Sequence, residues 1–160
     1  MALGLLACVY YLAVEIYLLG GRLGFPLDDS WIHLQFARNL AAGDGLSFNS
    51  GVPVPGSTAP LWTALLSIGF VLPGNPILWT KLLGLVLYLI GGLLTYRLAL
   101  ELGIARQWSI LAALMSMGTS WLVWSALSGL EIPLFVLLSL AGIILHVRER
   151  QEPGRLPLSL

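Results

Sequence analysis

The sequence predicts an all-α fold, a polytopic transmembrane helix bundle with one substantial polar loop near its start. Of its 160 residues, 58% are hydrophobic and only 10% are charged, whereas soluble domains carry about a quarter charged residues. A chain of this length cannot bury that much apolar surface in its own interior. Because the apolar residues also gather in long runs, we expect lipid to be the solvent for much of the chain.

Charge and cysteine content exclude several classes of protein. Eight basic and eight acidic residues give a formal net charge of zero, so the chain lacks the basic footprint of a nucleic-acid-binding protein. Cys8 is the single cysteine. This excludes an internal disulfide and a cysteine-rich metal site.

Apolar runs predict where the chain crosses the membrane. A spanning helix needs about 20 mostly apolar residues. Four segments satisfy this length requirement, at about 2–20, 77–98, 107–127 and 131–147. A fifth apolar run, at 60–72, is shorter. It begins at Pro60 and is followed by the Pro- and Gly-containing segment 73–76, so we expect an interfacial helix there.

The distribution of arginine predicts the orientation. With four spans and the N-terminus inside, the loop 21–76 is extracytoplasmic. Excess basic residues mark the cytoplasmic side. The positions inside then hold five arginines, Arg97, Arg106, Arg148, Arg150 and Arg155. Because the chain ends on an apolar tail without a closing element, we expect it to be the N-terminal portion of a longer protein.

The loop contains a predicted amphipathic helix at about 29–42. Asp28, Asp29 and Ser30 form a helix start, because acidic side chains favour the positive end of the helix dipole. Apolar residues then recur at four-residue spacing, as expected for a helix on the membrane surface. These apolar residues are Ile32, Phe36 and Leu40, and the polar positions are His33, Gln35, Arg38 and Asn39.

Each acidic residue near the membrane boundary has two possible roles, one structural and one functional. Asp28 and Asp29 either cap the helix, or act as a general base on a hydroxyl or as ligands of a divalent cation. His33 lies one turn from Asp29 and either shares its proton or makes only an i,i+4 contact. Glu131 stands alone between two spans, where an acid either favours a helix start or faces a functional cavity. Glu15 lies inside the first predicted span, and the sequence assigns it no role.

Several motifs together resemble one enzyme superfamily. The run from Asp28 to Asn49, with its acidic pair, Ala-Arg-Asn-Leu, Gly-Asp-Gly and Phe-Asn elements, resembles the first external loop of polytopic type C (GT-C) glycosyltransferases. The likeness is closest to bacterial arabinofuranosyl and mannosyl transferases. The segments 56–62 and 128–131 are similar to their Pro-Leu-Trp element and to the acidic motif after their third span. Ser57 departs from the pattern, where the family has an aromatic residue.

The resemblance implies a function. It implies a transferase in the bacterial inner membrane that moves a sugar from a polyprenyl-phosphate donor to an acceptor hydroxyl on a glycan, lipid or protein of the cell envelope. Asp28 and Asp29 are then the catalytic candidates, and His33, Arg38, Lys81 and Glu131 are the candidates for substrate binding. A divalent cation, if the enzyme uses one, would be held by Asp28, Asp29 and Glu131. We expect residues 1–160 alone to be inactive.

Two other classes of function remain open at this stage. A multi-pass transporter subunit predicts polar residues through the depth of the membrane. A non-catalytic assembly protein predicts that the acidic pair tolerates substitution. The gathering of acids on one side of the predicted spans favours surface chemistry over transport.

Overall fold

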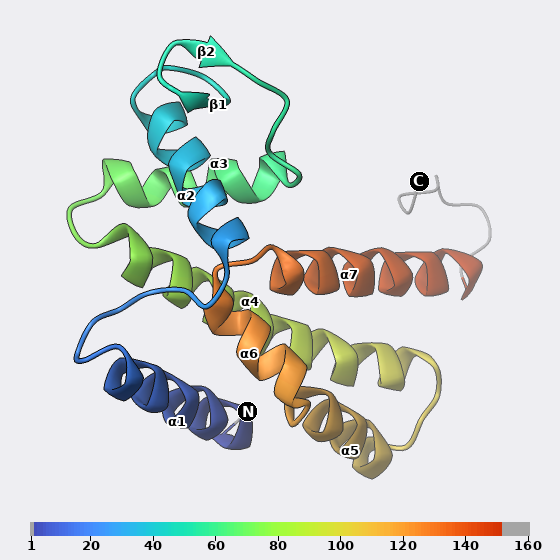
Figure 1. Cartoon of the computed structure of the whole chain (residues 1–160). Helices are drawn as coiled ribbons and strands as arrows, with labels where there is room; N and C mark the ends of the chain where they lie inside the picture. The colour runs from blue at the N-terminus through green and yellow to red at the C-terminus, as the bar shows by residue number, and fades with distance from the viewer. Residues whose placement is uncertain (1, 152–160) are drawn as a thin grey trace.

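The computed structural model describes residues 2–151, and Figure 1 shows a helical molecule with one short hairpin. Helix makes up 73% of it, which confirms the predicted helical class. Within the described residues the helices are α1 (Ala2–Leu18), α2 (Asp28–Ala41), α3 (Pro60–Val71), α4 (Pro76–Glu101), α5 (Arg106–Met117), α6 (Ser120–Ser128) and α7 (Ile132–Gln151). The strands β1 (Ser47–Asn49) and β2 (Val52–Pro53) pair antiparallel.

Helix α4 is the centre of the fold. The side chain of Asn75 accepts a hydrogen bond from the Ile77 N–H and so caps its first turn. α4 packs against α3, α5, α6 and α7, and α1 packs against α6. A Cβ at Gly84 would collide with the carbonyl oxygen of Ala126. The absence of a side chain at Gly84 therefore lets α4 and α6 approach at backbone distance.

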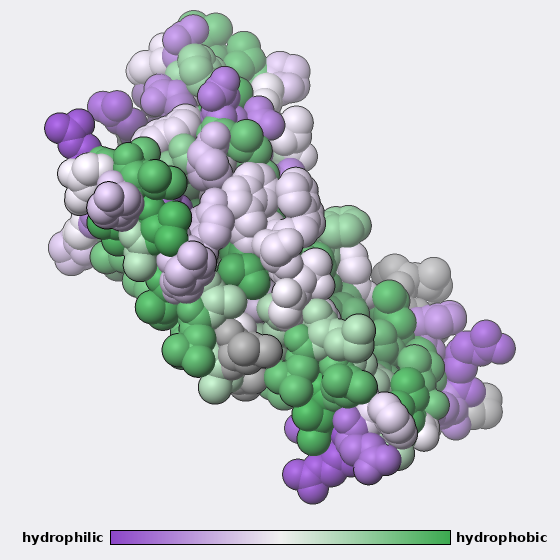
Figure 2. All heavy atoms as spheres, turned by 60° about the horizontal axis from the view of Figure 1, so that its bottom comes forward, coloured by the Kyte–Doolittle hydropathy of each residue, from purple (hydrophilic) through white to green (hydrophobic). Residues whose placement is uncertain are grey.

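The helices bear out the predicted membrane character in part. Within the described residues, α4 and α7 are long and apolar enough to cross a membrane. α1, with 17 residues, is about 25 Å long, less than the roughly 30 Å of a hydrocarbon core. Figure 2 shows hydrophobic side chains over much of the helical body, interrupted by a band of intermediate hydropathy, with hydrophilic groups toward its ends. The exposed apolar side chains of α4 recur along one face, at Leu78, Leu82, Val86, Ile90 and Leu93. These features indicate a membrane protein.

The region of the expected span at 107–127 is not one straight helix. Residues 106–128 form two helices, α5 and α6, bent by 56° at a break. The break falls at Gly118 and Thr119, two residues of low helix propensity. The carbonyl of Met117, which helix continuation would have bonded, accepts a hydrogen bond from the hydroxyl of Tyr88 on α4. The tertiary contact thus satisfies the backbone group that the break exposes.

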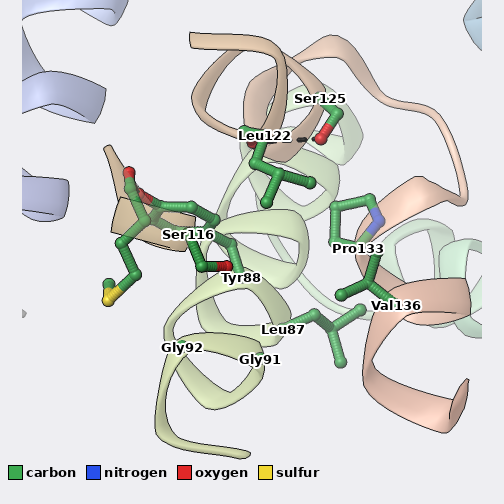
Figure 3. A pocket seen from close by; sticks show the side chains of 10 residues that line it. Leu87, Tyr88, Gly91, Gly92, Ser116, Leu122, Ser125, Pro133 and Val136 are labelled. Atoms are coloured by element: carbon green, nitrogen blue, oxygen red, sulfur yellow. Dashed lines mark hydrogen bonds between the residues drawn. The ribbon is translucent and has the colours of Figure 1, made fainter. Parts of the chain in front are cut away.

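The helix–helix packing around this break is apolar. Figure 3 shows a small pocket between α4, α6 and α7, where Gly91 and Gly92 of α4 face Pro133 and Val136 of α7 and the residues near the break. Its volume is only about 20 Å³. This part of the molecule is closely packed helix–helix interior.

Helix α2 forms where it was predicted, but the predicted division into faces is wrong. The structure buries His33 and Asn39, which the pattern assigned to a polar face. The physical reason is that α2 packs on α3 and against the β1 strand. The amide of Asn39 donates to the carbonyls of Ser47 and Phe48, each at 2.9 Å. Asn39 therefore anchors the hairpin to the helix.

Candidate functional site

A polar cleft lies where α2 meets the turn between α6 and α7. Its volume is about 330 Å³. Three ionisable side chains and Thr58 supply its polar groups. The lining residues are Asp29, Ile32, His33, Gly56, Thr58, Leu130, Glu131 and Ile132. Segments that are far apart in the sequence therefore build one site.

His33 and Glu131 are in direct contact in this cleft. Nε2 of His33 lies 3.2 Å from Oε2 of Glu131. His33 is only 4% exposed, whereas Glu131 is 35% exposed. Nδ1 of His33 is buried and has no hydrogen-bond partner among residues 2–151. The imidazole is thus held from one side, and the carboxylate is the member of the pair that faces solvent.

Asp29 and Asp28 occupy different positions although they are neighbours in sequence. Both are exposed in the first turn of α2. Asp29 is one helical turn before His33 and lines the cleft, but Asp28 is absent from its lining. Successive helix positions point about 100° apart, so the pair cannot face the same cavity equally. Asp29 is the carboxylate with access to the cleft.

Side chains from three helices hold the backbone that carries Glu131. The last carbonyls of a helix lack intrahelical partners. Here Lys81 of α4 donates to the Leu127 oxygen at 2.9 Å. The hydroxyl of Ser30 on α2 donates to the Ser128 oxygen at 2.6 Å, and the indole N–H of Trp62 on α3 donates to the Gly129 oxygen at 2.9 Å. These bonds fix the turn against α2.

Gly129 is required at this turn for two reasons. Its φ is +87°, the left-handed region that a glycine adopts after a helix end. A Cβ there would also lie 2.8 Å from the Phe25 ring and 3.0 Å from Cβ of Ser30. The Ser-Gly-Leu-Glu segment therefore brings the loop and the helix end together at backbone distance.

The remaining predicted binding residues lie outside the cleft. Arg38 is exposed near the end of α2, about 14 Å along the helix axis from Asp29. Lys81 is 2% exposed, and its ammonium lies 2.8 and 3.0 Å from the two carboxylate oxygens of Glu15. Neither side chain lines the cleft, so their role in substrate binding stays a prediction.

The Glu15–Lys81 pair gives Glu15 a structural role that sequence reasoning missed. Two opposite charges in otherwise apolar runs were the available signal, because an ionisable group in such a run needs a partner. The Lys81 ammonium also lies 4.9 Å from the centre of the Phe25 ring. With Leu127 included, this one ammonium joins α1, α4, α6 and the start of the loop.

Within residues 2–151, no three His, Cys, Asp or Glu side chains come close enough to hold a metal ion. The set Asp28, Asp29 and Glu131 therefore stays a prediction, and Asp28 does not share the cleft with the other two. In comparisons with known proteins, no family model, no curated protein and no solved structure matches this chain.

Proposed function

We propose that the chain belongs to a membrane glycosyltransferase that moves a sugar from a polyprenyl-phosphate donor to an acceptor hydroxyl. The observation that carries the proposal is the convergence of Asp29, His33 and Glu131 on one cleft at the loop end of an apolar helical body. A carboxylate there meets both a water-borne acceptor and a lipid-borne donor. The loop motifs, which resemble those of GT-C enzymes, point to the same chemistry.

In the proposed reaction Asp29 is the general base. Its carboxylate takes the proton of the acceptor hydroxyl while the hydroxyl oxygen forms a bond to the anomeric carbon of the donor sugar. The bond between that carbon and the phosphate oxygen breaks, and the lipid phosphate leaves as an anion. Since the leaving group departs ionised, the reaction needs no strong general acid. Glu131 orients the acceptor by accepting a hydrogen bond from a second hydroxyl.

The test compares Asp29→Asn with Asp28→Asn in the full-length protein. The assay follows transfer of radiolabelled sugar from polyprenyl-phosphate sugars to acceptors in vesicles from expressing cells. Asp29→Asn should lower the rate by about 100-fold or more, the usual contribution of a general base. Asp28→Asn is the matched control, because Asp28 is also exposed in the first turn of α2 but does not line the cleft. Full activity in the Asp28→Asn/Asp29→Asn double variant rejects the proposal.

The extracytoplasmic placement of the cleft has its own test. In a Cys8→Ser background, single cysteines replace Ser50 in the loop and Gln107 at the other end of the helical body, both exposed. An impermeant maleimide applied to intact cells should label position 50 and spare position 107. The reverse pattern would put the cleft in the cytoplasm, where the proposed lipid-linked donor chemistry has to be abandoned.

A further inference from the structure

A groove of about 310 Å³ lies between α4 and α5, away from the polar cleft. Figure 1 shows α5 at the opposite end of the helical body from α2, the helix that borders the cleft. The two cavities share no lining residue. The groove is therefore a separate feature, and the proposed transfer reaction gives it no role.

The groove has the length of one membrane leaflet. Its lining residues on α5 recur every three or four positions and so form one stripe along the helix, at Arg106, Ile110, Leu114 and Met117. Met117 is only 3% exposed, and a Cβ at Gly92 of α4 would collide with its sulfur, so the groove ends where the two helices touch. From Arg106 to Met117 the stripe is about 16 Å long, roughly half of a hydrocarbon core of about 30 Å.

Polar groups stand only at the open end of this groove. Arg106 is the first residue of α5, and Tyr96 lies one turn beyond Gly92 toward the end of α4. Within residues 2–151, the guanidinium of Arg106 and the hydroxyl of Tyr96 have no hydrogen-bond or ion-pair partner. No acidic side chain lines the groove, and Glu101 at the end of α4 is already paired with Arg148. The groove thus combines an apolar floor with a cation and a hydroxyl donor at its mouth.

We propose that this groove binds an anionic phospholipid from the leaflet opposite the cleft. One acyl chain lies along the stripe on α5, and the phosphate accepts hydrogen bonds from Arg106 and Tyr96. Basic pockets between membrane helices recognise anionic headgroups in this way, and a guanidinium–phosphate contact is a strong, charge-assisted hydrogen bond. The occupant is a bilayer lipid and not the sugar donor, whose reaction is proposed at the other end of the helical body. The assignment is independent of the transferase proposal.

The first experiment measures lipid binding to the full-length protein in detergent by native mass spectrometry. The protein is titrated with dioleoyl phosphatidylglycerol or with dioleoyl phosphatidylcholine, which have the same acyl chains but differ in net charge. We expect the first phosphatidylglycerol to bind about 5-fold more tightly than phosphatidylcholine, the contribution of one arginine near a membrane surface. Arg106→Gln should abolish this preference. Arg97→Gln is the matched control and should keep it, because Arg97 is also exposed near the end of α4 but does not line the groove.

Two results of this titration overturn the proposal. One is equal binding of the two lipids by the unmodified protein. The other is an equal loss of preference in Arg106→Gln and Arg97→Gln, which would assign the effect to the basic surface as a whole.

A second pair of variants tests the apolar part of the groove. Ala113→Trp fills the groove without changing its charge, whereas Ala112→Trp adds the same side chain at the neighbouring position, which does not line it. Both alanines are half-buried. We expect Ala113→Trp to weaken phosphatidylglycerol binding by about 5-fold or more, since the acyl chain loses its place, and Ala112→Trp to leave it nearly unchanged. Unchanged binding in Ala113→Trp would place the lipid elsewhere.

Photocrosslinking locates the lipid without any substitution. Phosphatidylglycerol with a diazirine in one acyl chain is bound to the full-length protein, irradiated, and its adducts are mapped by peptide mass spectrometry. Adducts should concentrate on residues 92–96 and 110–117. If these peptides stay unlabelled while other apolar surfaces react, another part of the full-length protein covers the groove, and the proposal is rejected. None of these outcomes bears on Asp29, so failure here is distinguishable from failure of the transferase proposal.

Discussion

Two charged clusters lie near the turn after α6, and they differ in how completely their polar atoms are paired. In the Glu15–Lys81 cluster both carboxylate oxygens bind the ammonium, which also binds the Leu127 carbonyl. In the cleft, Asp29 is exposed, Glu131 is held by one oxygen, and Nδ1 of His33 has no partner in the described part of the chain.

The difference separates a structural role from a functional one. Burying charges is tolerable only when each is paired and hydrogen-bonded. The Glu15–Lys81 cluster meets that condition, because both carboxylate oxygens and the ammonium have hydrogen-bond partners. Under the proposed function, the polar atoms of the cleft that lack partners among the described residues are free to bind a substrate. We therefore expect substitutions in the first cluster to change stability and substitutions in the second to change activity.

The largest effect is expected for Lys81→Met. It removes the partner of a carboxylate that is only 11% exposed, and breaking a buried pair in this way typically costs about 3–5 kcal/mol. It also frees the Leu127 carbonyl. The measurement is unfolding of the purified chain in mixed micelles with increasing dodecyl sulfate. The double variant Glu15→Gln/Lys81→Met should regain part of the loss, because it leaves no unpaired charge.

A matched control for Lys81→Met is Arg148→Ala. Arg148 pairs with Glu101, with its Nε 2.9 Å from Oε1, but Arg148 is 55% exposed. Solvent screening limits such a pair to about 0–1 kcal/mol. If both substitutions cost the same, the distinction between the buried cluster and ordinary ion pairs is lost.

An intermediate effect is expected at the turn that joins the two clusters. Gly129→Ala places a Cβ on a residue with left-handed backbone angles, which should destabilise the protein by about 1–2 kcal/mol. The same Cβ would press against Phe25 and Ser30, and this overpacking should cost about 1–3 kcal/mol more. Gly103→Ala has a similar φ of +77° but nothing within 4 Å of the new Cβ. The difference in unfolding free energy between the two variants isolates the close packing. A vanishing difference would mean that the turn relaxes freely.

The smallest effect on stability is expected for Glu131→Gln. The Glu131 side chain is 35% exposed and contacts His33, so the loss of that contact should change the free energy of unfolding by less than about 1 kcal/mol. The transfer activity should nevertheless fall, since the amide no longer offers a charged acceptor. A loss of stability as large as that of Lys81→Met would show that the cleft residues are structural as well.

The sequence by itself determined the helical class and the places of most helices. Long apolar runs with few charges allow little besides a helix in lipid. The predicted helix at about 29–42 matches α2, because the acidic residues that favour its start and the glycine that ends it are local signals, each acting within one or two helical turns. Local signals of this kind need no knowledge of the rest of the chain. The acidic segments at 28–29 and 131 were found in the same way.

Only the tertiary structure decided which of these residues meet. The break at Gly118 depends on a hydroxyl from α4 to satisfy Met117, and the burial of Asn39 depends on the hairpin. The choice of Glu131 over Asp29 as the contact of His33, and of Glu15 as the partner of Lys81, joins residues from separate parts of the chain. Spacing along a chain cannot rank such pairings, because their free energy comes from burial and geometry that exist only once the helices have packed.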